Sequence, residues 1–166
     1  MASDYTFDAV SKVNLTIVSE AIDTAMKEVN NRFDFKDSNS SVSLDAKALE
    51  LTLASKDDFK VRALWDIVAM RFAKRGLPLK NFEVPEEVEA ALGQTARMKV
   101  KIIQGIPTDK AKEIIAALKQ SGLKVQGSIQ AAQLRVSSKS KDALQEAMQF
   151  MRTQDFKVDL QFENFR

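Results

Sequence analysis

The sequence has no cysteine and no histidine among its 166 residues. Without cysteine the chain can form no disulfide bond, and cysteine-ligated zinc ions and iron–sulfur clusters are excluded. Without histidine no side chain has an ordinary pKa near 7, and the Ser-His and Cys-His nucleophile pairs of hydrolases are excluded. We therefore expect a binding protein that is not an enzyme and needs no cofactor.

A long apolar run and an excess of one charge are also missing. No segment approaches the ~20 apolar residues that cross a bilayer, and residues 1–4 lack the pattern of a signal peptide. These absences predict a cytoplasmic protein without membrane contact. The 25 basic residues nearly balance the 23 acidic ones, so the whole chain does not have the charge of a nucleic-acid-coating protein. Any cationic site must be local.

The sequence does contain an internal repeat with an offset of 83 residues. The run 49–56 aligns with 132–139 without a gap, and both alternate apolar and polar residues as half-buried strands do. The same offset superimposes two helical stripes with the spacing i, i+3, i+4, i+7. These stripes are Val61, Leu64, Trp65 and Val68 in the first half, and Leu144, Ala147, Met148 and Met151 in the second.

Each half also has an earlier helix. In the first half this helix covers about 14–30, capped by Asn14, and the later helix covers about 57–75. In the second half Pro107 opens the earlier helix and Gly122 ends it. Predicted strands flank the helices at 5–10, 32–36, 81–84, 98–103, 123–129 and 158–162. Residues 42–44 are a further candidate strand, and 85–93 are a candidate for a short linking helix.

The order strand-helix-strand-strand-helix-strand in each half predicts the fold class. It is α+β, a tandem of two ferredoxin-like βαββαβ domains, each an antiparallel sheet with both helices on one face. The other face of each sheet is then open. Alternation along the strands indicates which side chains it presents.

Several basic and polar side chains are predicted to lie on these open faces: Arg32, Lys36, Lys99, Lys101, Lys124, Gln126 and Arg135. The basic ones form a local cationic floor suited to phosphates. A solvated surface is the alternative, because lysines on exposed strands are common and discourage aggregation. Phe33 and Phe35 are predicted to face the core. The strand 133–137 has no aromatic ring on which RNA bases could stack.

Short segments spread over nearly the whole chain resemble the YajQ family of small bacterial nucleotide-binding proteins. They are FDAVSKV at 7–13, RFDFK at 32–36, RG at 75–76, QGI at 104–106, LKVQ at 123–126, the region 135–145 and FENFR at 162–166. One departure is the hairpin tip Ala131-Ala132, where the family usually has glycine and an acidic residue.

The resemblance implies that the first strands of the two domains are exchanged. The first domain would comprise 13–104, completed by the strand 98–103, and the second 4–12 with 105–166. The resemblance also implies nucleotide binding, for which the seven residues named above are the predicted site. Some members of the family act as cyclic di-GMP effectors through a transcription regulator, and the same role is expected here. An RNA- or ribosome-associated binding module is the alternative.

Overall fold

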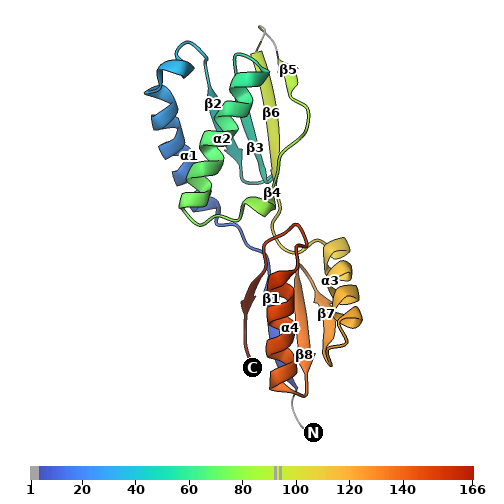
Figure 1. Ribbon diagram of the computed structural model, residues 1–166. Helices are drawn as coiled ribbons and strands as arrows, with labels where there is room; N and C mark the ends of the chain where they lie inside the picture. The colour runs from blue at the N-terminus through green and yellow to red at the C-terminus, as the bar shows by residue number, and fades with distance from the viewer. Residues whose placement is uncertain (1–3, 92, 94) are drawn as a thin grey trace. The chain divides into compact units, whose positions relative to one another are not determined.

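The computed structural model describes residues 4–91, 93 and 95–166. The chain forms two compact units (Figure 1). The central unit is Val13–Ile103, and the terminal unit combines the chain up to Lys12 with Gln104–Arg166. Each unit is an antiparallel sheet with two helices on one face. The predicted α+β tandem of ferredoxin-like units is therefore confirmed.

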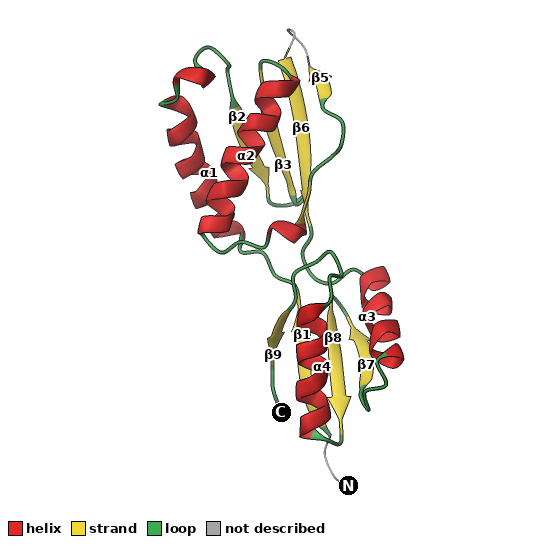
Figure 2. Ribbon diagram, viewed as in Figure 1, coloured by secondary structure: helices red, strands yellow, loops and turns green. Residues whose placement is uncertain are grey.

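The central unit has the sheet order β2-β3-β6-β4, and β5 pairs with one end of β6. Its strands are β2 (Ser41–Asp45), β3 (Glu50–Ser55), β4 (Phe82–Glu83), β5 (Glu89–Ala91) and β6 (Thr95–Ile102). The helices α1 (Leu15–Asn30) and α2 (Asp58–Lys74) cover one face of this sheet (Figure 2). Two short 3-10 helices, Phe33–Phe35 and Leu79–Asn81, complete the unit.

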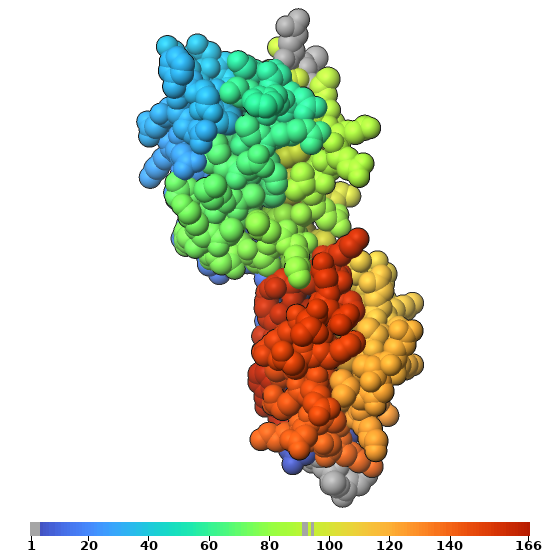
Figure 3. Space-filling view, viewed as in Figure 1, coloured from blue at the N-terminus to red at the C-terminus, as the bar shows by residue number. Residues whose placement is uncertain are grey.

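The terminal unit has the sheet order β7-β8-β1-β9. Its strands are β1 (Tyr5–Val10), β7 (Gln126–Gln130), β8 (Gln133–Ser138) and β9 (Gln161–Glu163). The helices α3 (Thr108–Gln120) and α4 (Lys141–Thr153) lie on one face, where their side chains meet and hide the sheet (Figure 3). The opposite face has no helix from the described part of this unit.

The first strands are exchanged between the units, as the resemblance implied. β1 lies between β8 and β9, with Ala9 opposite Leu134, and β6 lies between β3 and β4, with Val100 opposite Leu51. Each exchanged strand thus places small or branched apolar side chains under the helices of a unit that is mostly built from the other half. All four of these side chains are fully buried.

The helices begin where the sequence predicts. The side chain of Asn14 accepts hydrogen bonds from the N–H groups of Thr16 and Ile17, and Asp57 accepts one from Lys60 at 2.7 Å. These caps satisfy amides that have no partner within the helix. The predicted stripe of α4 is buried in full, and in α2 Trp65 is partly buried and contacts the rings of Phe72 and Phe82.

The predicted strand at 32–36 is wrong. Phe33–Phe35 forms a 3-10 helix, which places Phe35 in the core but leaves Phe33 86% exposed. Asp37 and Asn39 follow with positive φ angles of 60° and 53°, which a strand does not tolerate. The second strand of the central unit is instead β2, which contains the candidate segment 42–44.

Three further segments differ from the prediction. The described part of 85–93 contains no helix, and Glu89–Ala91 extends the sheet as β5 because it pairs with β6. The strand predicted at 123–129 begins only at Gln126, so Lys124 precedes it. The final strand is shorter than predicted and is β9.

Candidate functional site

The open face of the terminal unit is lined by amides and hydroxyls. On β8 it presents Gln133, Arg135 and Ser137, and their cross-strand partners on β7 are Gln130, Ser128 and Gln126. On β1 it presents Asp8, directly opposite Arg135. No aromatic ring lies at these positions, so base stacking of the RNA-recognition type has no platform on these strands.

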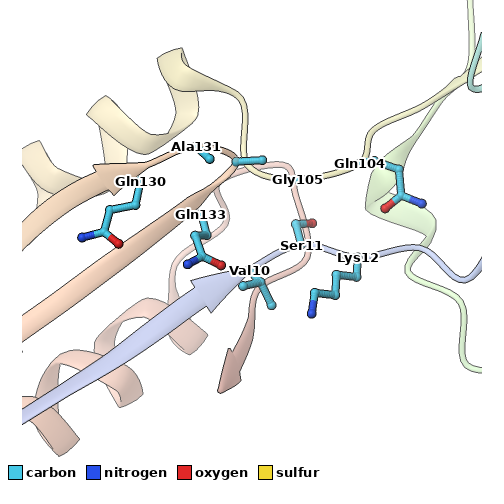
Figure 4. A pocket seen from close by; sticks show the side chains of 9 residues that line it. Val10, Ser11, Lys12, Gln104, Gly105, Gln130, Ala131 and Gln133 are labelled. Atoms are coloured by element: carbon cyan, nitrogen blue, oxygen red, sulfur yellow. The ribbon is translucent and has the colours of Figure 1, made fainter. Parts of the chain in front are cut away.

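A hollow of about 670 Å³ lies at one end of this face, and we call it the hairpin hollow. Its lining comes from the end of β1, the start of the second half and the β7–β8 turn: Val10, Ser11, Lys12, Gln104, Gly105, Gln130, Ala131, Ala132 and Gln133. Gln130 and Gln133 lie side by side on neighbouring strands (Figure 4). The volume falls within the ~300–1000 Å³ of typical small-molecule sites.

Gly105 holds the walls of the hairpin hollow together. Its N–H donates to the carbonyl oxygen of Ser11 at 2.7 Å, and the next N–H, of Ile106, donates to the carbonyl oxygen of Ala132 at 2.8 Å. A methyl group at Gly105 would lie 2.5 Å from Cβ of Ala132, and φ is +80°. Only glycine combines this conformation with so close an approach.

The charges of this face are paired around Asp8, whose exposed fraction is 1%. Nε of Arg135 donates to Oδ1 of Asp8 at 2.9 Å, and Nδ2 of Asn164 donates to Oδ2 at 2.9 Å. The hydrogen bond from Arg135 lowers the pKa of Asp8 below its ordinary value, although burial opposes the shift. Asp8 in turn raises the pKa of Arg135. Arg135 is therefore an anchored cation.

The open face of the central unit is different. Arg97, Lys99 and Lys101 alternate along β6 with buried neighbours and are exposed, as predicted for the two lysines. Both lysines line a hollow of about 440 Å³ together with Glu83, Val84 and Pro85. Neither lysine forms an ion pair with any residue that the structure describes. Their charge is therefore available to a ligand.

Arg32 and Lys36 do not lie on a sheet. Arg32 precedes the 3-10 helix, and its guanidinium donates to both carboxylate oxygens of Asp34 at 3.0 Å. This contact raises the pKa of Arg32 and lowers the pKa of Asp34. Lys36 follows the same helix. The reason for placing these two side chains in a sheet-face site was the strand at 32–36, and that strand does not exist.

The remaining predicted residues, Lys124, Gln126 and Arg135, lie in the terminal unit. Gln126 lies on the open face opposite Ser137, in the same sheet as Arg135. Lys124 lies before the strand, at the end away from the β7–β8 turn, and lines a hollow of about 420 Å³ together with Gln126, Ser137 and Ser140. The seven predicted residues thus lie in at least three separate places: beside the 3-10 helix, on β6 of the central unit, and in the terminal unit.

The sequence reading overlooked Gln130, Gln133 and Asp8. Glutamines are abundant on exposed strands, so neither amide attracts attention until the hairpin places the two opposite each other. Asp8 falls within the segment 7–13 that carries the family resemblance, and this was the available signal. One of its hydrogen-bond donors, Asn164, is far away in the sequence.

The geometry is that of a small α+β protein with two antiparallel sheets, each with two helices on one face and an open opposite face. The family model described as nucleotide-binding protein YajQ-like matches residues 5–166. The chain belongs to this family.

Relatives align with the chain over nearly their full lengths. A protein of Elusimicrobium minutum is 54% identical over 99% of both chains, and one of an Exiguobacterium species is 48% identical over all of both. A protein of Koribacter versatilis is 44% identical over 99% of this chain and 98% of its own. All three are named nucleotide-binding proteins, and none is named as an enzyme. In the part of the chain that the structure describes, no helix is both long and apolar enough to cross a bilayer.

Proposed function

We propose that this chain is a cytoplasmic nucleotide receptor without catalytic activity, that its ligand is a cyclic dinucleotide such as cyclic di-GMP, and that the bound form signals through a transcription regulator. The observation that supports binding most directly is the pair Gln130 and Gln133, whose amides lie side by side at the hairpin hollow. The choice of cyclic di-GMP and of the partner rests on the family resemblance. Binding and signalling are therefore separate claims.

The hairpin hollow combines two kinds of recognition. Each glutamine amide offers both donors and an acceptor, which is the combination that reads the edge of a base. Arg135 lies two residues after Gln133 on the same strand, with its side chain 35% exposed, and Lys12 lies at the rim with its side chain 62% exposed. Two cations beside an amide-lined hollow match the phosphates and bases of a dinucleotide.

RNA is the second candidate ligand, and Lys99 and Lys101 favour it. They form an exposed, unpaired pair of cations on an extended strand, which suits a phosphate backbone. The terminal face lacks the aromatic rings that stack on single-stranded bases, and this weakens the case for RNA there. The two candidates thus point to different units.

Calorimetric titration with cyclic di-GMP tests the proposal. The parent should bind with saturation, and Gln133→Ala should weaken binding by about 5- to 150-fold, because a base-edge contact contributes ~1–3 kcal/mol. Lys112→Ala, on the exposed side of α3, is the control and should bind like the parent.

The outcomes separate the candidates. If Gln133→Ala binds like the parent, the hairpin hollow is not the site. If Lys99→Ala and Lys101→Ala lose affinity instead, the ligand binds the central unit. A single-stranded RNA whose affinity falls steeply between 50 and 200 mM salt, with no binding of cyclic di-GMP, would replace the receptor proposal by the RNA alternative.

A further inference from the structure

Asp8 is a buried carboxylate on the face of the terminal sheet opposite α3 and α4. It lies in the middle of β1, opposite Arg135 on β8 and opposite Glu163 on β9, with 1% of its surface exposed. A carboxylate this deeply buried is unfavourable unless donors surround it. The arrangement of those donors shows what the charge does.

Four hydrogen bonds reach Asp8 from three side chains. Arg135 donates through Nε to Oδ1 at 2.9 Å and through Nη2 to Oδ2 at 3.4 Å. Asn164 and Gln133 each donate an amide hydrogen to Oδ2, at 2.9 Å and 3.4 Å. Because Arg135 lowers the pKa of Asp8, the carboxylate is ionised at neutral pH and can only accept.

An acceptor-only neighbour fixes which way an amide faces. Gln133 must direct Nε2 towards Asp8, because its carbonyl oxygen Oε1 would otherwise oppose a negative charge. Oε1 is then directed away from Asp8, while the same side chain lines the hairpin hollow. Gln130 forms no such bond with Asp8. Of the two glutamines that face each other across the β7–β8 hairpin, only Gln133 is oriented by this carboxylate.

We propose that Asp8 is a positioning residue that sets the base preference of the hairpin hollow, which rests on the proposed nucleotide function. Through Gln133 it presents a hydrogen-bond acceptor to the ligand. Guanine offers two adjacent donors on one edge, N1–H and the 2-amino group, whereas hypoxanthine keeps only N1–H. The two lone pairs of Oε1 can accept from both donors of guanine but from only one donor of hypoxanthine, so this acceptor favours guanine.

The test compares cyclic di-GMP with cyclic di-IMP, which lacks only the 2-amino groups. The parent should prefer cyclic di-GMP by about 3- to 10-fold, the effect of one hydrogen bond. Asp8→Asn keeps the shape of the side chain but removes the charge, so Gln133 can turn and the preference should fall to about 1- to 2-fold. Glu146→Gln, an exposed carboxylate on α4, is the matched control and should keep the preference of the parent.

The ratio of the affinities for cyclic di-GMP and cyclic di-IMP shows whether Asp8 positions Gln133 or only supports the fold. If Asp8→Asn lowers the affinity for both ligands equally, Asp8 is only structural and the proposal is wrong. If Asp8→Asn does not fold by circular dichroism, Gln133→Leu replaces it: the proposal places the preference on Oε1 of Gln133, so a preference that survives this substitution overturns the proposal. A parent that binds both ligands equally overturns the role of Asp8 alone. A parent that binds neither overturns the nucleotide function, and this role with it.

Discussion

The two units share one fold but differ at the centre of their open faces. In the terminal unit Asp8 lies opposite Arg135, and Asn164 donates a further hydrogen bond to Asp8. At the equivalent register of the central unit Lys99 lies opposite Thr52, and Lys99 is exposed. One face therefore has an ion pair with a buried carboxylate, which also contacts Gln133 at the hairpin hollow, and the other has a row of exposed cations.

This difference shows that the fold determines which positions are presented, while single residues determine what those positions can bind. The cations of the central face have acidic neighbours across the strands. Glu89 pairs with Arg97 at 3.3 Å, and Lys101 lies in register between Glu50 and Glu83. Such cross-strand neighbours temper the charge of the face. The anchored Arg135 has a fixed geometry instead, which favours a specific ligand over a diffuse one.

The largest expected difference comes from the two central residues themselves. Asp8→Ala should destabilise the terminal unit by about 1–3 kcal/mol, because Arg135 and Asn164 lose their hydrogen bonds to a buried carboxylate. Lys99→Ala should change the stability of the central unit by less than about 0.5 kcal/mol, because the lysine is exposed and unpaired. Hydrogen exchange of amides in β8 and β3 measures each unit separately.

The proposed difference between the two faces is wrong if Asp8→Ala and Lys99→Ala change the stability of their units equally. A small effect of Asp8→Ala would mean that water replaces the carboxylate without loss. A large effect of Lys99→Ala would mean that the central face is packed against a partner.

Low pH should destabilise the terminal unit more than the central unit. The pKa of Asp8 is lowered in the folded protein, so its stabilising contribution is complete above the ordinary pKa, near 4, and is lost as the pH falls through the lowered value. In the central unit Arg32 also lowers the pKa of Asp34, but that pair is exposed and contributes little. We expect amide protection in β1 and β8 to fall below about pH 4 in the parent. Asp8→Asn should remove this pH dependence.

The next effect concerns the wall of the hairpin hollow. Gly105→Ala should cost about 2–3 kcal/mol, because it adds strain at positive φ to a clash with Ala132. Gly122→Ala in the terminal unit and Gly76→Ala in the central unit have similar φ angles but nothing within 4 Å, so each should cost only about 1 kcal/mol. Urea denaturation of the three variants tests this order. Equal losses would show that the hollow relaxes around the methyl group.

A smaller effect with opposite signs is expected at the two hairpins. Ala131, in the β7–β8 turn, and Leu49, in the β2–β3 turn, both have φ near +53°. Ala131→Gly should stabilise the terminal unit by about 0.5 kcal/mol, because the alanine is exposed and only strain is relieved. Leu49→Gly should destabilise the central unit, because the leucine packs against the core. Melting temperatures of the two variants should therefore move in opposite directions.

The sequence predicted most of the fold because local signals and the repeat agree. The local signals are helix caps such as Asn14 and the alternation in 49–56 and 132–139. The repeat with an offset of 83 residues predicts the same order of elements in both halves, so each half supports the prediction for the other. The strand at 32–36 was wrong because two phenylalanines two residues apart are too short a pattern to distinguish a strand from a 3-10 helix.

The candidate site was less predictable for a different reason. The alternation of apolar and polar residues correctly placed Lys99, Lys101, Gln126 and Arg135 on open sheet faces. It does not show which of these residues share a sheet or have ionic partners. The Asp8–Arg135 pair requires the strand exchange, and its closure requires Asn164, which has a positive φ angle. Contacts between residues so far apart in the sequence have no local signature.

The smallest expected effect concerns the corrected 3-10 helix of the central unit. Phe33 is 86% exposed, so Phe33→Ala should change the free energy of unfolding by less than about 0.5 kcal/mol. Phe35, two residues later, is 5% exposed and lies under Lys60, whose Nζ is 5.0 Å from the ring centre, so Phe35→Ala should cost about 3 kcal/mol. Urea denaturation of both variants decides between a 3-10 helix and a strand. A strand with both rings in the core would make the two losses similar, whereas the 3-10 helix makes them differ several-fold.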